Sequence, residues 1–186
     1  TGGKTVLHHR ELTYAVVSSE TLFFEENDLM QSYRLISTAL VNGFQKLGIN
    51  AYLSKGSPSI LSRTNNPCFS FPTPNELEVD GKKVVGSAQK RDNKALLQHG
   101  SIPISMDYEL YARVARFHPR LLQRSMTTLS EISTKGIDDL RTALISSFTE
   151  LVGSEFIPFS WEKIEDPALL DDLREKYASD DWNHSL

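Results

Sequence analysis

Two short runs of β-forming residues, Leu77–Val79 and 84–88, stand on either side of the dipeptide Asp80-Gly81. An Asp-Gly pair favours a tight hairpin turn because both of its residues tolerate positive φ. The pattern therefore predicts a β-hairpin that holds Lys82 and Lys83 in a rigid position. A chain with this hairpin must supply further strands, because an isolated two-stranded hairpin is only marginally stable in water.

A third run, residues 96–104, is apolar at both ends but contains polar residues and a glycine in its middle. A purely structural strand has little reason to carry such residues, and a glycine within a strand indicates close approach by a ligand or a neighbouring backbone. The lone cysteine, Cys68, precedes the hairpin. We therefore expect the chemistry of this protein between Cys68 and Ile102.

The rest of the chain predicts further strands and helices. Alternating residues predict a strand at 12–18 beside the hairpin, with Tyr14 and Val16 on one face. Apolar residues at helical spacing predict a core helix that starts at a cap on Asn27 or Asp28 and ends at Leu47 before Gly48. The remaining expectations are an edge strand at 49–53, a mobile loop at 54–67, a weakly patterned stretch at 120–132, a strand at 155–159, and helices at 107–116, Ile137–Val152 and 166–177.

The bulk composition restricts the class of protein. At 186 residues and 39% hydrophobic content, the chain suits one domain with a real core. A formal net charge of −4 argues against a nucleic-acid surface. A local basic patch near the hairpin would instead suit an acidic protein partner; its members are Lys82, Lys83, Lys90, Arg91 and Lys94.

Other features concern location and completeness. A single cysteine excludes an internal disulfide and a multi-cysteine metal site, and fits a reducing cytoplasm. No apolar run approaches the ~18 residues of a membrane span, and no signal peptide is recognisable. Because the chain starts at Thr1 and leads directly into a turn, we expect it to be part of a longer protein.

The residues suggest nucleophilic chemistry at Cys68. Lys82 or Lys83 would favour its thiolate form if one of them lies close by, and His99 is the alternative base. Gly86 and Ser87 either present backbone N–H groups to a developing oxyanion or form a β-bulge. Ser87 lacks the surroundings of a nucleophilic serine, and no nucleotide-binding loop is present.

Two N-terminal features give weaker signals. The consecutive glycines Gly2 and Gly3 allow an anion or an extended ligand to approach the backbone, but a pair of glycines is a weak signal and an ordinary turn is the favoured explanation. His8 and His9 are metal ligands by residue type, yet no further ligands at metal-site spacing accompany them.

Four segments resemble the superfamily of lipoate-protein ligase A and the octanoyltransferases. They read TGGKTVLHHRELTYAVV, CFSFPTPNELEVDGKKVVGSAQKR, LLQHGSI and KYASDDWN, and together they extend over nearly the whole chain in the family's order. The chain is most similar to the cysteine-dependent octanoyltransferases of Gram-positive bacteria. The resemblance implies an α/β fold like the catalytic domain of biotin protein ligases, with a mixed β-sheet flanked by helices.

Such enzymes move an octanoyl group from the phosphopantetheine thioester of acyl carrier protein to a lysine of a lipoyl domain. The acceptors include the glycine cleavage H protein and the acyltransferase subunits of 2-oxoacid dehydrogenases. The resemblance makes Cys68 the nucleophile and Lys83 its partner, with no cofactor and no metal. The implied substrate-binding residues are Thr1, Gly2, Gly3, His8, Gly86, Ser87, Gln98, His99 and Gly100, with Ser101 beside them.

Two departures from the family and two alternatives stay open. Family members have a further stretch before the TGG segment, and they commonly carry His-Asp where this chain has His8 and His9. One alternative is an ATP-dependent lipoate-protein ligase, in which Lys83 contacts an acyl-adenylate and Cys68 is incidental. The other is a non-catalytic module that binds lipoyl domains or acyl carriers.

Overall fold

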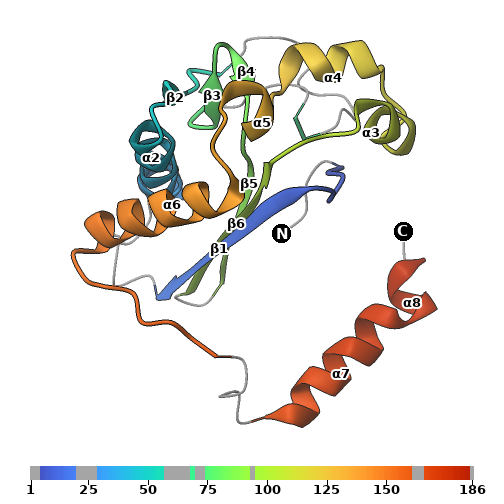
Figure 1. Cartoon of the computed structure of the whole chain (residues 1–186). Coiled ribbons are helices and arrows are strands. Elements are labelled where there is room, and N and C mark those ends of the chain that lie inside the picture. The colour runs from blue at the N-terminus through green and yellow to red at the C-terminus, as the bar shows by residue number, and fades with distance from the viewer. Residues whose placement is uncertain are drawn as a thin grey trace. The chain divides into compact units, whose positions relative to one another are not determined.

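The computed structural model describes residues 5–19, 29–56, 68–69, 74–92, 95–160 and 166–184. The chain divides into two compact units, residues 1–154 and 155–186. The first unit holds two three-stranded antiparallel sheets and most of the helices, and the second holds two helices (Figure 1). The predicted substrate-binding residues Thr1, Gly2 and Gly3 lie outside the described residues.

The first sheet has the strand order β1-β6-β5, with β6 (Ala95–Pro103) in the centre. Strand β1 (Glu11–Ser19) pairs with β6 along its whole length, and β5 (Gly86–Asp92) pairs with the other side. The strands predicted at 12–18 and 96–104 are confirmed. The expectation that the first of them lies beside the hairpin is wrong, because β1 and the hairpin belong to different sheets.

The second sheet has the order β2-β3-β4 and contains the predicted hairpin. Strands β3 (Leu77–Val79) and β4 (Lys82–Lys83) flank a turn in which both Asp80 and Gly81 have positive φ, 51° and 75°. The second arm is shorter than predicted, because residues 84–85 pass into the core and β5 then joins the first sheet. Strand β2 (Ala51–Leu53) pairs only with β3 among the described strands, which confirms the predicted edge strand.

Helices α2 (Leu29–Lys46) and α6 (Ile137–Val152) pack side by side against the main core (Figure 1). The two helices approach closely at Gly43, where an added Cβ would lie 2.6 Å from Leu144 Cδ2. The Ser147 hydroxyl also donates to the carbonyl of Ala39 at 2.6 Å. Both helices were predicted from their apolar period, although Met30, expected on the apolar face of α2, is exposed.

Three short helices follow the first sheet. The predicted helix α3 (Tyr108–Val114) starts at Asp107, whose carboxylate accepts from the Leu110 amide at 2.9 Å. Helices α4 (Pro119–Ser125) and α5 (Leu129–Ile132) were missed, because two turns or fewer leave too few apolar positions to show a period. The Glu131 carboxylate accepts from the Thr128 amide and so caps α5.

The second unit contains α7 (Pro167–Ala178) and α8 (Asp180–Asn183). The predicted helix at 166–177 is confirmed, and the Asp166 side chain caps it by accepting from the Leu169 amide. The strand predicted at 155–159 is wrong: this segment is irregular and exposed, and Pro158 cannot donate to a strand ladder.

Candidate functional site

Cys68 lies where the first residues of the described chain meet α3. Its amide donates to the carbonyl of Thr5 at 3.0 Å, and the Tyr111 hydroxyl donates to the same carbonyl at 2.9 Å. Phe69, next in the chain, is fully buried against Tyr111 in a small apolar cluster. The Cys68 side chain itself is half-buried, so the thiol has fixed surroundings and remains accessible.

Lys83 carries the group closest to the thiol. Its ammonium donates to the Cys68 carbonyl at 2.8 Å, to Glu76 Oε1 at 2.5 Å and to Cys68 Sγ at 3.6 Å. These contacts use all three donors of an ammonium group. The side chain is only 1% exposed, and the Glu76 carboxylate balances its charge. A positive charge at this distance in a buried site stabilises negative charge on the sulfur.

Gly86 gives the thiol the space it occupies. An added Cβ at this position would lie 2.9 Å from Phe69 Cζ and 3.5 Å from Cys68 Sγ. Gly86 and Ser87 pair in regular register with Ser101 and Gly100, so the alternative of a β-bulge is wrong. Glycine is required here because the sulfur and the Phe69 ring pack directly on the strand.

A partly buried chain of hydrogen bonds connects α2 with the first sheet and reaches Ser87. Arg91 Nη2 donates to Ser32 Oγ at 2.6 Å, and Ser32 Oγ donates to Gln89 Oε1 at 3.2 Å. Gln89 Nε2 then donates to Gln98 Oε1, and Gln98 Nε2 donates to the Tyr14 hydroxyl, each at 3.1 Å. This direction leaves the Tyr14 hydrogen for Ser87 Oγ, 2.7 Å away.

Two phenols near Cys68 were missed by the sequence analysis. Burial is the main cause that raises the pKa of Tyr33, and the negative charges of Glu76 and an ionised Cys68 raise it further. Burial and an ionised Cys68 also raise the pKa of Tyr111. Both phenols therefore stay neutral hydrogen-bond donors. The only sequence signal for Tyr33 was its place in an apolar helical period, which indicates a core residue rather than a site.

The structure brings some predicted site residues together and separates others. Cys68, Lys83 and Gly86 meet at the sulfur, and Ser87 lies beside Gly86 on the same strand. Gln98 and Gly100 belong to the neighbouring polar chain; the close approach predicted at Gly100 is to Gly86 O and Tyr14 Cε1, 2.5 and 2.6 Å from an added Cβ.

The two predicted histidines lie apart from this group. His8 is exposed, and its Nδ1 lies 2.6 Å from Glu11 Oε1. His99 is half-buried, opposite Ala15 and Ala88 in the register, and strand alternation turns it away from the face that carries Gln98 and Gly100. Lys83, and not His99, contacts the thiol.

The basic patch predicted around the hairpin does not form a continuous surface. Lys83 is buried against Glu76, and Arg91 is turned inward to Ser32. Lys94 lies outside the described residues. Only Lys82 and Lys90 of the predicted set remain as surface charges in the described part of the chain.

The described residues contain neither a metal-binding cluster nor a membrane-spanning helix. Within them, no three His, Cys, Asp or Glu side chains gather closely enough to hold a metal ion. Over the same ranges, no helix combines the length and the apolar character that crossing a membrane requires.

Solved structures place this fold among the catalytic domains of lipoate and biotin protein ligases. A lipoate-protein ligase A bound with ATP matches with a TM-score of 0.72 at 21% identity, over 93% of this chain and 64% of that chain. A biotin protein ligase from Aquifex aeolicus matches with a TM-score of 0.53 at 17% identity, over 77% and 50% of the two chains. At these identities the likeness concerns the fold alone, and the predicted α/β fold class is confirmed.

The chain belongs to the lipoyl protein ligase A/B catalytic domain family, whose sequence model matches residues 1–149. The octanoyltransferase LipM of Kyrpidia tusciae is 35% identical over 198 residues, covering 99% of this chain and 72% of that protein. LipM of Bacillus subtilis is 33% identical over 199 residues, with the same two shares. The resemblance read from the four sequence segments is confirmed.

Proposed function

We propose that this chain is an octanoyltransferase that carries its acyl group as a thioester on Cys68. The contact between the Lys83 ammonium and Cys68 Sγ is the observation that carries the proposal. Family membership and relatives named octanoyltransferase support the acyltransferase class. A non-catalytic binding module has no need of a buried lysine held against a half-exposed thiol.

The reaction has two steps that resemble each other. The Cys68 thiolate attacks the carbonyl carbon of the donor thioester, a tetrahedral oxyanion forms, and the donor thiolate leaves and takes up a proton. The acyl group is then a thioester on Cys68. An acceptor lysine, as the neutral amine, attacks this carbonyl; the Cys68 thiolate leaves, the amine loses a proton, and an amide remains. Exchange of one thioester for another is nearly balanced in energy, so the first step requires no ATP.

Lys83 has two roles in this scheme. Its positive charge first stabilises the attacking thiolate and then the oxyanion that develops beside it. Glu76 accepts a hydrogen bond from the ammonium and holds it in place within the buried site. Because the donors of Lys83 already have acceptors, little reorganisation is required when charge develops on the sulfur.

The neighbouring polar chain supports the same site from the sheet. We propose that Ser87, Gln98 and Gly100 line the part of the site that binds the acyl carbonyl. Gly86 leaves room for the sulfur. His8, His99, Thr1, Gly2 and Gly3 remain candidates for substrate binding on the strength of the family resemblance. The partners that we propose are an acyl carrier protein as donor and lipoyl domains as acceptors, in the cytoplasm.

The first experiment mixes the protein with octanoyl-acyl carrier protein, without ATP, and measures intact mass. We expect one added octanoyl group, released by hydroxylamine and absent from Cys68→Ala. Because the chain contains one cysteine, a hydroxylamine-labile adduct identifies its own position.

Two other results would contradict the proposal. Transfer that occurs only with free lipoate and ATP would favour the ligase alternative, whose fold this chain shares. An absence of transfer under both conditions, in the presence of a lipoyl domain, would favour the binding module.

A further inference from the structure

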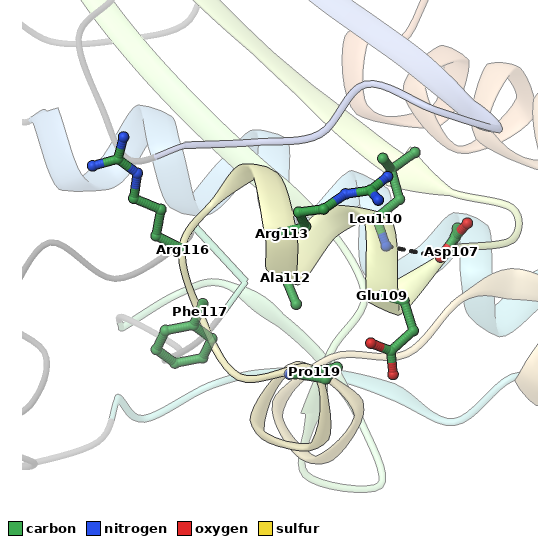
Figure 2. A pocket seen from close by; sticks show the side chains of 8 residues that line it. All are labelled: Asp107, Glu109, Leu110, Ala112, Arg113, Arg116, Phe117 and Pro119. Carbon is green, nitrogen blue, oxygen red and sulfur yellow. Dashed lines mark hydrogen bonds between the residues drawn. The ribbon is translucent and has the colours of Figure 1, made fainter.

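A polar pocket of about 540 Å³ lies where α3 ends and α4 begins (Figure 2). Arginines and carboxylates line its rim, and Ala112, Phe117 and Pro119 supply apolar surface. Figure 2 shows Arg113 on α3, Arg116 in the turn that follows it, and Pro119 at the start of the next helix. The pocket is separate from the thiol site and is not used by the mechanism above.

Four exposed arginines lie on α3, on α4 and in the turn between them. Arg113, Arg116, Arg120 and Arg124 are exposed, and none of them forms an ion pair within the described part of the chain. Among the other exposed arginines of the described residues, Arg141 pairs with Asp138 at 2.9 Å and Arg174 with Asp171 at 3.1 Å, whereas Arg10 and Arg34 stand singly without an ion pair. The segment 107–125 has four arginines against two carboxylates, a net charge of +2 in a chain of net charge −4.

The arginines form two pairs on neighbouring segments of the chain. Arg113 and Arg116 both line the pocket. Arg120 and Arg124 are four residues apart and therefore share a face of α4. Arg116 has a φ of +51°, an uncommon conformation for a residue other than glycine. Large apolar side chains are also exposed on these helices, Val114 at 55% and Leu121 at 48%.

The pocket and the thiol adjoin the same apolar cluster. Ala112 and Phe117 line the pocket and also pack in the cluster that contains Cys68 and Phe69. In addition, Tyr111 of α3 shares the Thr5 carbonyl with the Cys68 amide. A partner seated on α3 and α4 is therefore placed beside the wall of the thiol site.

On the basis of the proposed function, we propose that Arg113, Arg116, Arg120 and Arg124 form the docking surface for the acidic carrier protein that delivers the acyl thioester. Guanidinium groups bind carboxylates and phosphates in a bidentate manner. A phosphopantetheine carrier offers both, as acidic side chains and as the phosphodiester at the base of its arm. A lipoyl domain lacks the phosphodiester, so the donor fits this surface better than the acceptor. In this proposal the arginines bind the acidic partner, the role that the sequence analysis expected of the basic residues around the hairpin.

The test separates docking from chemistry by using two donors. One is octanoyl-acyl carrier protein, and the other is octanoyl-N-acetylcysteamine, a small thioester with neither carboxylate nor phosphate. The rate of Cys68 acylation is followed by intact mass in single turnovers at low and high salt. The variants are Arg113→Glu/Arg116→Glu and Arg120→Glu/Arg124→Glu, and the matched control is Arg141→Glu on α6. Thermal melting confirms that each variant is folded.

We expect both double variants to raise the half-saturating concentration of the carrier on the order of tenfold at low salt, with a smaller effect at high salt. Acylation by the small thioester and all rates of the control should match those of the unmodified protein. Equal loss with both donors would overturn the proposal, because it would indicate damage to the thiol site.

Two further outcomes would also count against it. An unchanged carrier concentration dependence would exclude docking on this surface. A defect confined to the second half-reaction, transfer from acyl-Cys68 to a lipoyl domain, would assign the arginines to the acceptor instead. If the unmodified protein is acylated by neither donor, the proposed function itself fails, and this result is distinct from the others.

Discussion

The Lys83 ammonium donates to both the carbonyl and the sulfur of Cys68, at 2.8 and 3.6 Å, although fifteen residues separate the two in the chain. The same ammonium binds Glu76, so the half-buried thiol, the buried lysine and the buried carboxylate form one connected group. The hairpin brings them together, because Glu76 precedes its first arm and Lys83 ends its second. Stability and chemistry are therefore coupled at Lys83, and a designed pair of variants can separate them.

Removal of Lys83 alone should damage both stability and activity. Lys83→Met leaves the Glu76 carboxylate buried without its cation, a change that costs about 3–5 kcal/mol in other proteins. The double variant Lys83→Met/Glu76→Gln should recover most of this loss, because no buried charge remains, yet acylation of Cys68 should stay absent. Urea unfolding and intact-mass acylation measure the two effects. Recovery of acylation in the double variant would contradict the role of Lys83 as an electrostatic partner of the thiol.

Gly86→Ala should hinder acylation more than it destabilises the fold. The new Cβ would lie 2.9 Å from Phe69 Cζ, so the ring that packs beside Cys68 must move. We expect the acylation rate constant to fall on the order of tenfold or more, since small displacements at a reacting centre are costly. Gly136→Ala is the control, because its Cβ would have no atom nearer than 3.9 Å. Equal acylation rates in the two variants would show that Gly86 has no special steric role.

Interruption of the polar chain should affect acylation by way of Ser87. Tyr14→Phe removes the hydroxyl that contacts Ser87 Oγ at 2.7 Å, and the loss of this hydrogen bond should cost about 1 kcal/mol of stability. Gln98→Leu should cost more, about 1–3 kcal/mol, because Gln89 Nε2 and the Tyr14 hydroxyl both lose a buried partner.

Two readouts on Cys68 distinguish positioning from general damage. Octanoyl transfer builds an oxyanion, whereas alkylation by iodoacetamide does not. If Ser87 supports the acyl carbonyl, Tyr14→Phe should slow acylation and leave the alkylation rate of Cys68 unchanged. A parallel decrease in both rates would mean that the hydroxyl serves only the packing of the sheet.

Buried tyrosines should make the protein sensitive to alkaline pH. Burial raises the pKa of Tyr14, Tyr33, Tyr108 and Tyr111 in the folded state. A raised pKa favours the folded state only while the phenols are neutral, so this stability is fully present below about pH 10, the unfolded value, and is lost as the pH rises above it. Absorbance at 295 nm should report four fewer tyrosinates in the folded protein than in guanidinium at the same pH. The urea midpoint should fall in parallel above pH 10, and a constant midpoint up to pH 11 would contradict this coupling.

Local sequence patterns predicted the elements whose signals are local. The Asp80-Gly81 dipeptide predicted the hairpin turn, and the apolar period of Ile137–Val152 predicted a helix with those bounds. Strands were found where β-forming residues are continuous. The segment 155–159 shows the limit of this approach, because a β-forming run becomes a strand only where another strand offers a ladder.

Only some of the site residues could be predicted from the sequence, and which ones depended on residue type. Cys68 and Lys83 stand out because thiols and amines have chemistry of their own, and the family motifs named both. Tyr33 and Tyr111 could not be recognised in this way, because a tyrosine at helical spacing indicates a core residue. The surface charge was also misjudged, because a lysine in the sequence does not reveal whether it meets a carboxylate such as Glu76 or water.

The sequence by itself therefore determined the α/β class, the hairpin turn, the long helices, the family and the two residues with intrinsic reactivity. These properties depend on local propensity and residue chemistry, which can be read without coordinates. Only the tertiary structure decided that β1 pairs with β6, that Lys83 turns inward to Cys68 and Glu76, and that Ser87 belongs to a partly buried chain of hydrogen bonds. Each of these depends on contacts between segments distant in the chain, and local sequence does not encode which segments meet.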